Sequence, residues 1–204
     1  MSAPPKTVLH ASEEEAEAIR EAVRHADVGT LGMGRARAEL KHVPGLVALL
    51  LDERVSGPIY DLPRPITEDS VTRWVVEGQA QALAGDGLLL VTLDDDGEVA
   101  GYSKISVWPE RSSAELAGAM RADQQNKGQG SLGMARTFGW IFETRGVRLM
   151  CLTAALDNVR SQKGIDASGF RRMGERDAVR PDGTVRRSVY WEMTRDEWRQ
   201  RHRL

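Results

Sequence analysis

The chain has 204 residues, of which 41% are hydrophobic, and its formal net charge is −2. These values predict one folded domain over residues 1–204, and they give no reason to expect nucleic acid or an acidic membrane surface as a partner. The single cysteine, Cys151, excludes an intrachain disulfide. Because no apolar run is long enough for a signal peptide or a membrane span, we expect a cytoplasmic protein without a membrane segment.

The first 86 residues are expected to be mainly helical. Ser12 is a predicted N-cap with Glu15 three residues later, as in a capping box, and apolar residues follow at helical spacing. Two more helices are predicted, the first interrupted near Pro44, with a proline-rich loop between them. The expected elements are helices over 11–26, 35–53 and 68–84 and a loop over 56–67.

The pattern changes at residue 87, where runs typical of strands begin. Residues 87–93 and 98–108 are joined by Asp-Asp-Asp-Gly, which predicts a hairpin, and 114–120 is a third strand candidate. This order predicts one domain of the α/β (α+β) class, with helices beside a mixed sheet. The later elements are a helix containing Leu132, Ala135, Phe138 and Phe142, a buried strand over 147–156, a short helix over 158–168 and a hairpin over 176–193 with Asp182 and Gly183 at the turn.

The run "QQNKGQGSLGMA", residues 124–135, places glycines at the start of a predicted helix. Main-chain N–H groups and the helix dipole favour an anion there, and Lys127 adds a positive charge, so a diphosphate is one guest. A tight strand-to-helix connection without a ligand is the alternative. The literal match to G-x-G-x-x-G is set aside, because the polar run "RADQQNK" separates Met120 from Gly128 and the preceding strands form hairpins.

Two motifs, "QNKGQG" over residues 125–130 and "DNVRSQKGIDASGF" over residues 157–170, together resemble the GCN5-related N-acetyltransferase (GNAT) family. "QNKGQG" fits the cofactor signature Q/R-x-x-G-x-G/A, with Gln125, Gly128 and Gly130 at the matching positions. Further along, "DNVRSQKGIDASGF" is similar to the next motif, in which Asn158 opens a helix that ends in Gly-Phe. The ending "SVYWEMTRDEWRQ" and the Asn-x-x-Ser sequence resemble the RimJ/RimL-type branch. The resemblance covers residues 87–194 well and the N-terminal helices loosely.

The resemblance implies a fold and a co-substrate. The fold is a mixed, mostly antiparallel sheet with a splayed central strand pair, divided into an acceptor-side region (1–86), a cofactor-binding core (87–194) and a tail (195–204). The co-substrate is acetyl-CoA, with its pyrophosphate on the amides of residues 126–131 and its pantetheine arm between the splayed strands. The implied cofactor-binding residues are Met120, Arg121, Gln125, Asn126, Lys127, Gly128, Gln129, Gly130, Ser131 and Asn158.

The implied reaction is acetyl transfer to a primary amine, either a protein N-terminus or a small molecule, by direct attack in a ternary complex. Glu115 is the candidate base, acting through a water, with a solvent-exposed edge-strand glutamate as the alternative and Asp123 as the second candidate. The position of the family's usual tyrosine acid holds Ile165. Ser161 is therefore the candidate proton donor, unless its hydroxyl bonds its own helix backbone.

The other reactive side chains receive simpler interpretations. Cys151 is expected in the core, and the four histidines lack ligand spacing, so no metal is predicted. Tyr60 and the loops over 28–34 and 56–67 are candidates for the acceptor side, and a homodimer is plausible for such domains. Because the usual tyrosine is missing, a catalytically weak acyl-CoA-binding regulatory domain is the alternative function. Four tryptophans are expected in the core or the cleft wall, namely Trp74, Trp108, Trp140 and Trp191.

Overall fold

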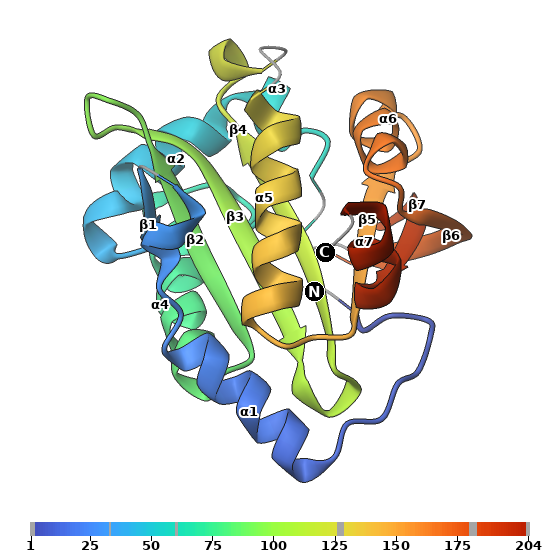
Figure 1. Cartoon of the computed structure of the whole chain (residues 1–204). Helices are drawn as coiled ribbons and strands as arrows, with labels where there is room; N and C mark the ends of the chain where they lie inside the picture. The colour runs from blue at the N-terminus through green and yellow to red at the C-terminus, as the bar shows by residue number, and fades with distance from the viewer. Residues whose placement is uncertain (1–2, 33, 60, 126–128, 180–182, 203–204) are drawn as a thin grey trace.

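The computed structural model describes residues 3–32, 34–59, 61–125, 129–179 and 183–202. Its centre is a seven-stranded sheet in the order β1-β2-β3-β4-β5-β7-β6, in which every neighbouring pair is antiparallel except β4–β5 (Figure 1). The sheet is therefore mixed and mostly antiparallel, as predicted. The strands are β1 (Arg35–Arg37), β2 (Gly87–Leu93), β3 (Val99–Trp108), β4 (Ser113–Met120), β5 (Leu149–Ala155), β6 (Arg171–Val179) and β7 (Val185–Thr194).

Helices cover both faces of the sheet and bury a separate apolar cluster on each. On one side, here called the α5 face, Ile19 of α1, Phe138 of α5 and Trp198 of α7 belong to one cluster. On the other, the α4 face, Leu46 of α2 and Val71 of α4 belong to the second. Figure 1 shows α5 in front of the strands and α4 behind them. The helices are α1 (Glu13–Arg24), α2 (Val43–Leu51), α3 (Glu53–Ser56), α4 (Glu68–Ala84), α5 (Gln129–Thr144), α6 (Val159–Ala167) and α7 (Arg195–His202).

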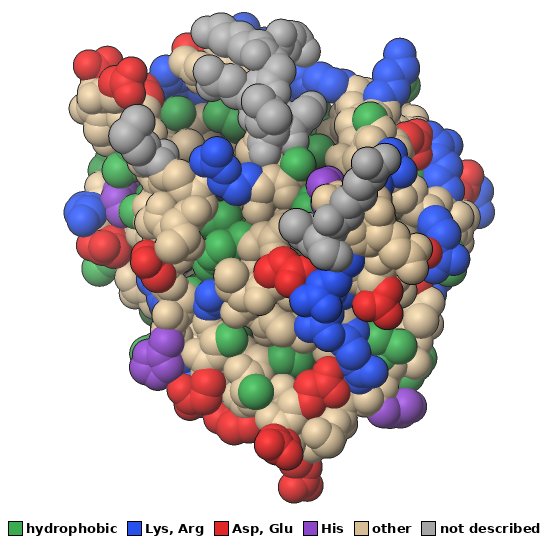
Figure 2. Space-filling model, in the orientation of Figure 1, with side chains coloured by type: hydrophobic (Ala, Val, Ile, Leu, Met, Phe, Trp, Pro, Cys, Tyr) green, Lys and Arg blue, Asp and Glu red, His purple; other side chains and the backbone are tan. Residues whose placement is uncertain are grey.

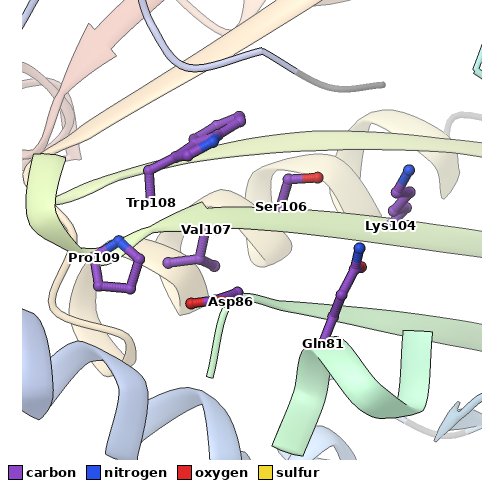
Figure 3. A pocket seen from close by; sticks show the side chains of 7 residues that line it. All are labelled: Gln81, Asp86, Lys104, Ser106, Val107, Trp108 and Pro109. Atoms are coloured by element: carbon purple, nitrogen blue, oxygen red, sulfur yellow. The ribbon is translucent and has the colours of Figure 1, made fainter. Parts of the chain in front are cut away.

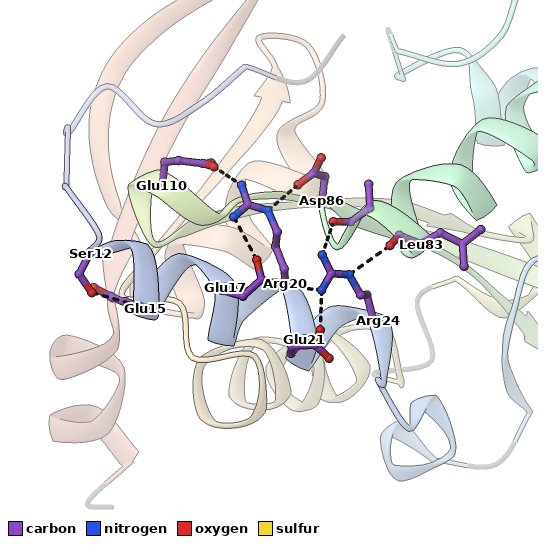
Figure 4. Close-up of polar contacts among 10 residues, drawn as sticks. Ser12, Glu15, Glu17, Arg20, Glu21, Arg24, Leu83, Asp86 and Glu110 are labelled. Carbon is purple, nitrogen blue, oxygen red and sulfur yellow. Dashed lines mark hydrogen bonds and ion pairs between the residues drawn. The ribbon is translucent and has the colours of Figure 1, made fainter.

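The helix α1 begins where the sequence predicts. Ser12 Oγ accepts a hydrogen bond from the Glu15 main-chain N–H at 3.1 Å. The predicted capping box is incomplete, because the Glu15 carboxylate pairs instead with Arg148 at 2.8 Å. Farther along, Arg20 reaches Glu110 and Asp86 on loops beside the sheet (Figure 4). In the view of Figure 2, carboxylates gather at the lower end of the molecule, where α1 begins. Over the rest of the surface seen in this view, neither positive nor negative charge dominates.

The predicted helix over 35–53 is wrong in its first part. Arg35–Arg37 forms the edge strand β1, which pairs with Leu90–Thr92 of β2. Pro44 lies in the first turn of α2 instead of interrupting a helix. A proline fits there because the first N–H groups of a helix have no partner within it. The first 86 residues therefore contribute a strand to the sheet as well as helices.

The parallel pair β4–β5 separates along its length. The register runs from Ser113 opposite Leu149 to Glu115 opposite Cys151 and stops there, although β4 continues to Met120. Beyond Glu115, the two strands no longer pair, which is the predicted splay. A gap thus opens in the middle of the sheet with Glu115 at its narrow end.

The N-terminal arm, defined as residues 3–10, covers the part of the α4 face that the helices leave bare. Lys6 N–H donates to Tyr190 Oη at 2.8 Å, and Thr7 N–H donates to the Glu192 carboxylate at 2.9 Å. Arg176 of β6 donates to the main-chain carbonyls of residues 3 and 4. Glu192 is 0% exposed and also accepts hydrogen bonds from Tyr190 Oη and Thr7 Oγ1. The arm is therefore held by the buried Glu192 carboxylate together with arginine side chains that donate to its main-chain carbonyls.

Candidate active site

A cavity of about 640 Å³ occupies the gap between β4 and β5. Its wall includes residues of the α5 face, such as Leu116 and Met134, and residues of the α4 face, such as Tyr102 and Thr153. Glu115 lies in the wall at the point where the strands part. The cavity therefore joins the two sides of the sheet through the gap, so two molecules entering from opposite faces can meet beside Glu115.

The edge of β4 offers main-chain groups to this cavity. Arg121 N–H donates to Ala100 of β3 at 2.7 Å, while Leu149 N–H of β5 donates to Ser112 at 3.1 Å. Successive residues of a strand direct their main-chain N–H and C=O groups to opposite neighbouring strands. The N–H and C=O groups of the even-numbered residues of β4 therefore point toward β5, and those of the odd-numbered residues point toward β3. Because pairing with β5 ends at Glu115, the N–H groups of Gly118 and Met120 face the gap.

Gln125 and Arg121, two of the predicted cofactor-binding residues, make hydrogen bonds and ion pairs within the protein. Gln125 donates to the Met120 carbonyl at 2.7 Å and accepts from Arg160 at the start of α6, so it braces the end of β4. The Arg121 side chain pairs with Asp94 at 3.0 Å and with Asp123 at 2.8 Å. Since its N–H bonds to β3, Arg121 offers no free amide to the gap.

Three arginines in the cavity wall were not predicted as site residues. Arg35 of β1 donates to Ser103 Oγ at 2.9 Å, and Arg136 of α5 donates to the carbonyl of Leu31 at 3.3 Å. Burial and then the nearby Arg136 lower the pKa of the Arg35 guanidinium. Within the described residues, Arg35 and Arg136 have no carboxylate partner, so the α5 side of the cavity carries uncompensated positive charge. The third of these arginines in the cavity wall is Arg160, at the start of α6.

The helix α6 begins at the wall of the cavity. Asn158 Oδ1 accepts from the Ser161 main-chain N–H at 3.2 Å, which confirms its predicted N-cap role. The Ser161 hydroxyl has no hydrogen bond within the described part of the chain, and the residue lines the cavity. Ile165 lines it too, whereas Asp166 is held by Arg172 and Trp191 Nε1, which keep the pKa of its carboxyl below the usual value. Asp166 is thus ionised at neutral pH and is no proton donor.

Glu115 is buried, contrary to the alternative of a solvent-exposed edge glutamate. It is 4% exposed, and β4 pairs with β3 on one side of it and with β5 on the other, so it is not on an edge strand. Thr153 Oγ1, across the gap, donates to Glu115 Oε1 at 3.2 Å. As an acceptor of this bond, the carboxylate is oriented toward the gap. Asp123, the second candidate base, is exposed and paired with Arg121, which lowers the pKa of its carboxyl.

Comparison with known proteins identifies the family. A family model described as an acetyltransferase (GNAT) domain matches residues 35–171. The chain belongs to the GNAT family of acetyltransferases. Among curated proteins, no match is found.

Solved structures share the fold of this GNAT acetyltransferase at low sequence identity. The ribosomal-protein-S5-alanine acetyltransferase of Vibrio fischeri is 14% identical, with a TM-score of 0.68 over 80% of this chain and 93% of that one. RimJ of Mycobacterium smegmatis, in complex with CoA-disulfide, is 18% identical, with a TM-score of 0.67 over 80% and 82%. A GCN5-related N-acetyltransferase from Brucella melitensis is 18% identical, with a TM-score of 0.64 over 80% and 76%.

Part of the cofactor motif of this acetyltransferase lies outside the described residues, namely Asn126, Lys127 and Gly128. The same holds for Tyr60. The main chain of Gln129–Ser131 forms the first turn of α5, where N–H groups lack partners within the helix. The Gly-Phe sequence has a structural basis: Gly169 adopts φ +86° after α6, and the Phe170 ring lies 4.9 Å from that of Phe138.

Other features of this acetyltransferase are structural. Cys151 is fully buried, and burial together with the charge of Glu115 raises the pKa of its thiol well above the usual value. Among the described residues, no group of three potential metal ligands occurs, and no helix is long and apolar enough to cross a bilayer. A second hollow of about 310 Å³ lies along β3, with Lys104, Ser106 and Trp108 in its wall (Figure 3).

Proposed function

We propose that this acetyltransferase moves the acetyl group of acetyl-CoA to a primary amine, by direct attack within a ternary complex. The observation that carries the proposal is the cavity through the sheet, with a buried carboxylate at the point where the strands part. The α5 side of the cavity carries the guanidinium groups of Arg35 and Arg136, and the α4 side carries the buried Glu115 carboxylate. Such a division suits a polyanionic donor on one side and a cationic acceptor on the other.

The residues of the α5 side fit coenzyme A. The N–H groups of Gly118 and Met120 lie on an edge of β4 that no described strand pairs with, which suits the carbonyl groups of a pantetheine arm. Arg160 and the first turn of α5 suit the phosphates, as does Asn158 beside them. Bound acetyl-CoA supplies the activated acetyl group. An N–H of this edge aimed at the acetyl oxygen would lower the barrier by about 3 kcal/mol, as oxyanion donors do.

Glu115 is the proposed base. The acceptor must lose a proton before it attacks, and an α-amine has a pKa of about 8 compared with about 10.4 for lysine. At pH 7, roughly one α-amine in ten is therefore neutral, so a modest base is sufficient for an α-amine. We propose that the Glu115 carboxylate takes the proton through a water, while its bond with Thr153 keeps it oriented.

Ser161 is the proposed donor to the departing thiolate. Its hydroxyl is free of protein partners among the described residues and lies in the cavity wall, at the first turn of α6. Ile165, at the position of the family's usual tyrosine, has no proton to give. A thiolate whose thiol has a pKa near about 8.5 is a stable leaving group close to neutral pH, so a hydrogen bond donated by the serine hydroxyl is adequate and the serine keeps its proton.

We propose a protein N-terminus as the acceptor. One structural neighbour carries the name ribosomal-protein-S5-alanine acetyltransferase and another is RimJ, which supports placement in the RimJ/RimL-like branch. The test is a CoA-release assay with acetyl-CoA and a panel of peptides with different first residues, lysine derivatives and polyamines. Turnover with at least one free-amine peptide and none with its N-blocked form is expected. Binding of acetyl-CoA without CoA release across the whole panel would instead support an acyl-CoA-binding regulatory domain.

A further inference from the structure

Tyr102 of β3 has a buried hydroxyl that no described residue of the chain engages. The residue is 3% exposed, and its ring packs edge-on against Trp74, with centroids 5.2 Å apart and planes at 81°. Its Oη makes no hydrogen bond to the described residues. Tyr102 belongs to the wall of the active-site cavity on the α4 face, opposite Ala119 of β4. The hydroxyl is thus hidden from solvent, on a residue that forms part of the wall of the space that the acceptor would enter.

A buried hydroxyl without a partner is costly, and proteins satisfy nearly all such groups. Phenylalanine would fill the same space without that cost, so a retained hydroxyl needs another explanation. A ligand that accepts its hydrogen bond provides one. The contrast within this chain is Tyr190, which is also buried but donates to Glu192.

A carboxylate lies in the wall of the same cavity as Tyr102. Asp61, in the loop after α3, also lines the cavity, and its side chain is 7% exposed. Its partner is Lys104, 3.5 Å away and 16% exposed, which approaches from the second hollow. Burial and then the charge of Asp61 raise the pKa of Tyr102 well above its usual value. Tyr102 is therefore a neutral donor, and Asp61 is an acceptor, on one wall of the cavity.

The position along the sheet limits what the pair contacts. Tyr102 is level with Ala119, four residues beyond Glu115 on β4. Four residues of extended chain span about 13 Å. An acceptor whose amine reaches Glu115 therefore extends to Tyr102 only if it is several bonds long. A short alkylamine at Glu115 would not reach.

We propose that Tyr102 and Asp61 form a specificity pair for a peptide acceptor, in which the Tyr102 hydroxyl donates to a main-chain carbonyl beyond the first residue and Asp61 accepts from a neighbouring N–H. An amide carries one such acceptor and one such donor, whereas a polyamine carries no carbonyl. The proposal rests on the proposed function, because it assigns the class of acceptor that the Glu115 site serves.

The test compares Tyr102→Phe with Tyr190→Phe in the full chain. For Tyr102→Phe, KM for a five-residue peptide should rise about tenfold, as expected for one lost hydrogen bond, while KM for butylamine and the Kd of acetyl-CoA stay unchanged. Its melting temperature should equal or exceed that of the wild type, because a buried unpaired hydroxyl is removed. Tyr190→Phe should melt at a lower temperature, with an unchanged ratio of the two KM values.

Two results for Tyr102→Phe would overturn the specificity pair alone. The first is an equal change of KM for the peptide and for butylamine. The second is a fall in the melting temperature of Tyr102→Phe as large as that of Tyr190→Phe, with KM for the peptide and for butylamine unchanged. Wild-type protein that binds acetyl-CoA but acetylates neither acceptor would refute the proposed function and the pair together. Asp61→Asn should reproduce the selective rise of KM for the peptide, and its failure to do so would count against the carboxylate's part.

Discussion

The variant Glu115→Gln is expected to lose acetyl transfer in a pH-dependent way while staying folded. Gln keeps the size of the side chain and an oxygen that accepts the bond from Thr153 at 3.2 Å. It removes a charge from a site that is 4% exposed, which relieves desolvation as it weakens that bond. These effects oppose each other, so we expect the free energy of unfolding to change by no more than about 1 kcal/mol.

The size of the activity loss follows from the supply of neutral amine. For an α-amine of pKa about 8, the neutral fraction is roughly 1% at pH 6 and roughly 90% at pH 9. A variant without its base depends on that fraction, whereas the wild type removes the proton at the site. We therefore expect wild-type kcat/KM to exceed that of Glu115→Gln by on the order of 100-fold at pH 6 and by less than about tenfold at pH 9.

The assay is CoA release with a peptide acceptor across pH 6 to 9, at saturating acetyl-CoA. A ratio of wild type to variant that is flat across this range would remove Glu115 from proton transfer. The control is Glu192→Gln, another buried carboxylate on the same face, which holds the arm and does not line the cavity. It should lower stability while leaving the pH profile of turnover unchanged.

Three further predictions concern the arm and the start of α6. Burial alone would raise the pKa of Glu192, but the bonds from Thr7 and Tyr190 outweigh it and lower that pKa. Glu192→Gln should therefore destabilise the chain by about 2 kcal/mol at pH 7. The difference in unfolding free energy between wild type and variant should fade below about pH 4, as the carboxyl of the wild type is protonated. Urea unfolding at pH 7 and below about pH 4 measures this difference, and an equal difference under both conditions would contradict the prediction. Asn158→Ala should cost about 1 kcal/mol as a lost N-cap, whereas Asn158→Asp should keep stability but weaken CoA binding in calorimetry through its negative charge; equal CoA affinity of Asn158→Asp and wild type would argue against phosphates there. Ser161→Ala should lower kcat with near-normal CoA affinity, and an unchanged kcat would exclude the serine as donor.

Local signals in the sequence predicted most elements well. The helix over 68–84 agrees with α4, because Thr67 caps it and Gly85, at φ +85°, ends it. The strand over 87–93 agrees with β2. The strand β1 was missed because Arg35–Arg37 is only three residues long and is a strand solely through its pairing with β2. A pattern read along the chain does not contain such a contact.

The candidate site shows the same division. The sequence indicated Asn158 through a family motif and Glu115 through its position on a predicted strand, and both signals can be read along the chain. Arg35 and Tyr102 were missed, since they come from strands far from the motifs and enter the wall only through the sheet. The alternative of an exposed edge-strand Glu115 stayed open in the sequence, because no local pattern shows how far β5 pairs along β4.

The central claim is that acetyl-CoA binds in the gap between β4 and β5. Hydrogen exchange of single amides, measured by NMR with and without acetyl-CoA, tests it directly. The amides of Gly118 and Met120 face the gap and should become strongly protected, whereas those of Ala117 and Ala119, which already bond to β3, should change little. Unchanged exchange at Gly118 and Met120 in the saturated complex, with protection appearing around Trp108 in the second hollow, would contradict the account.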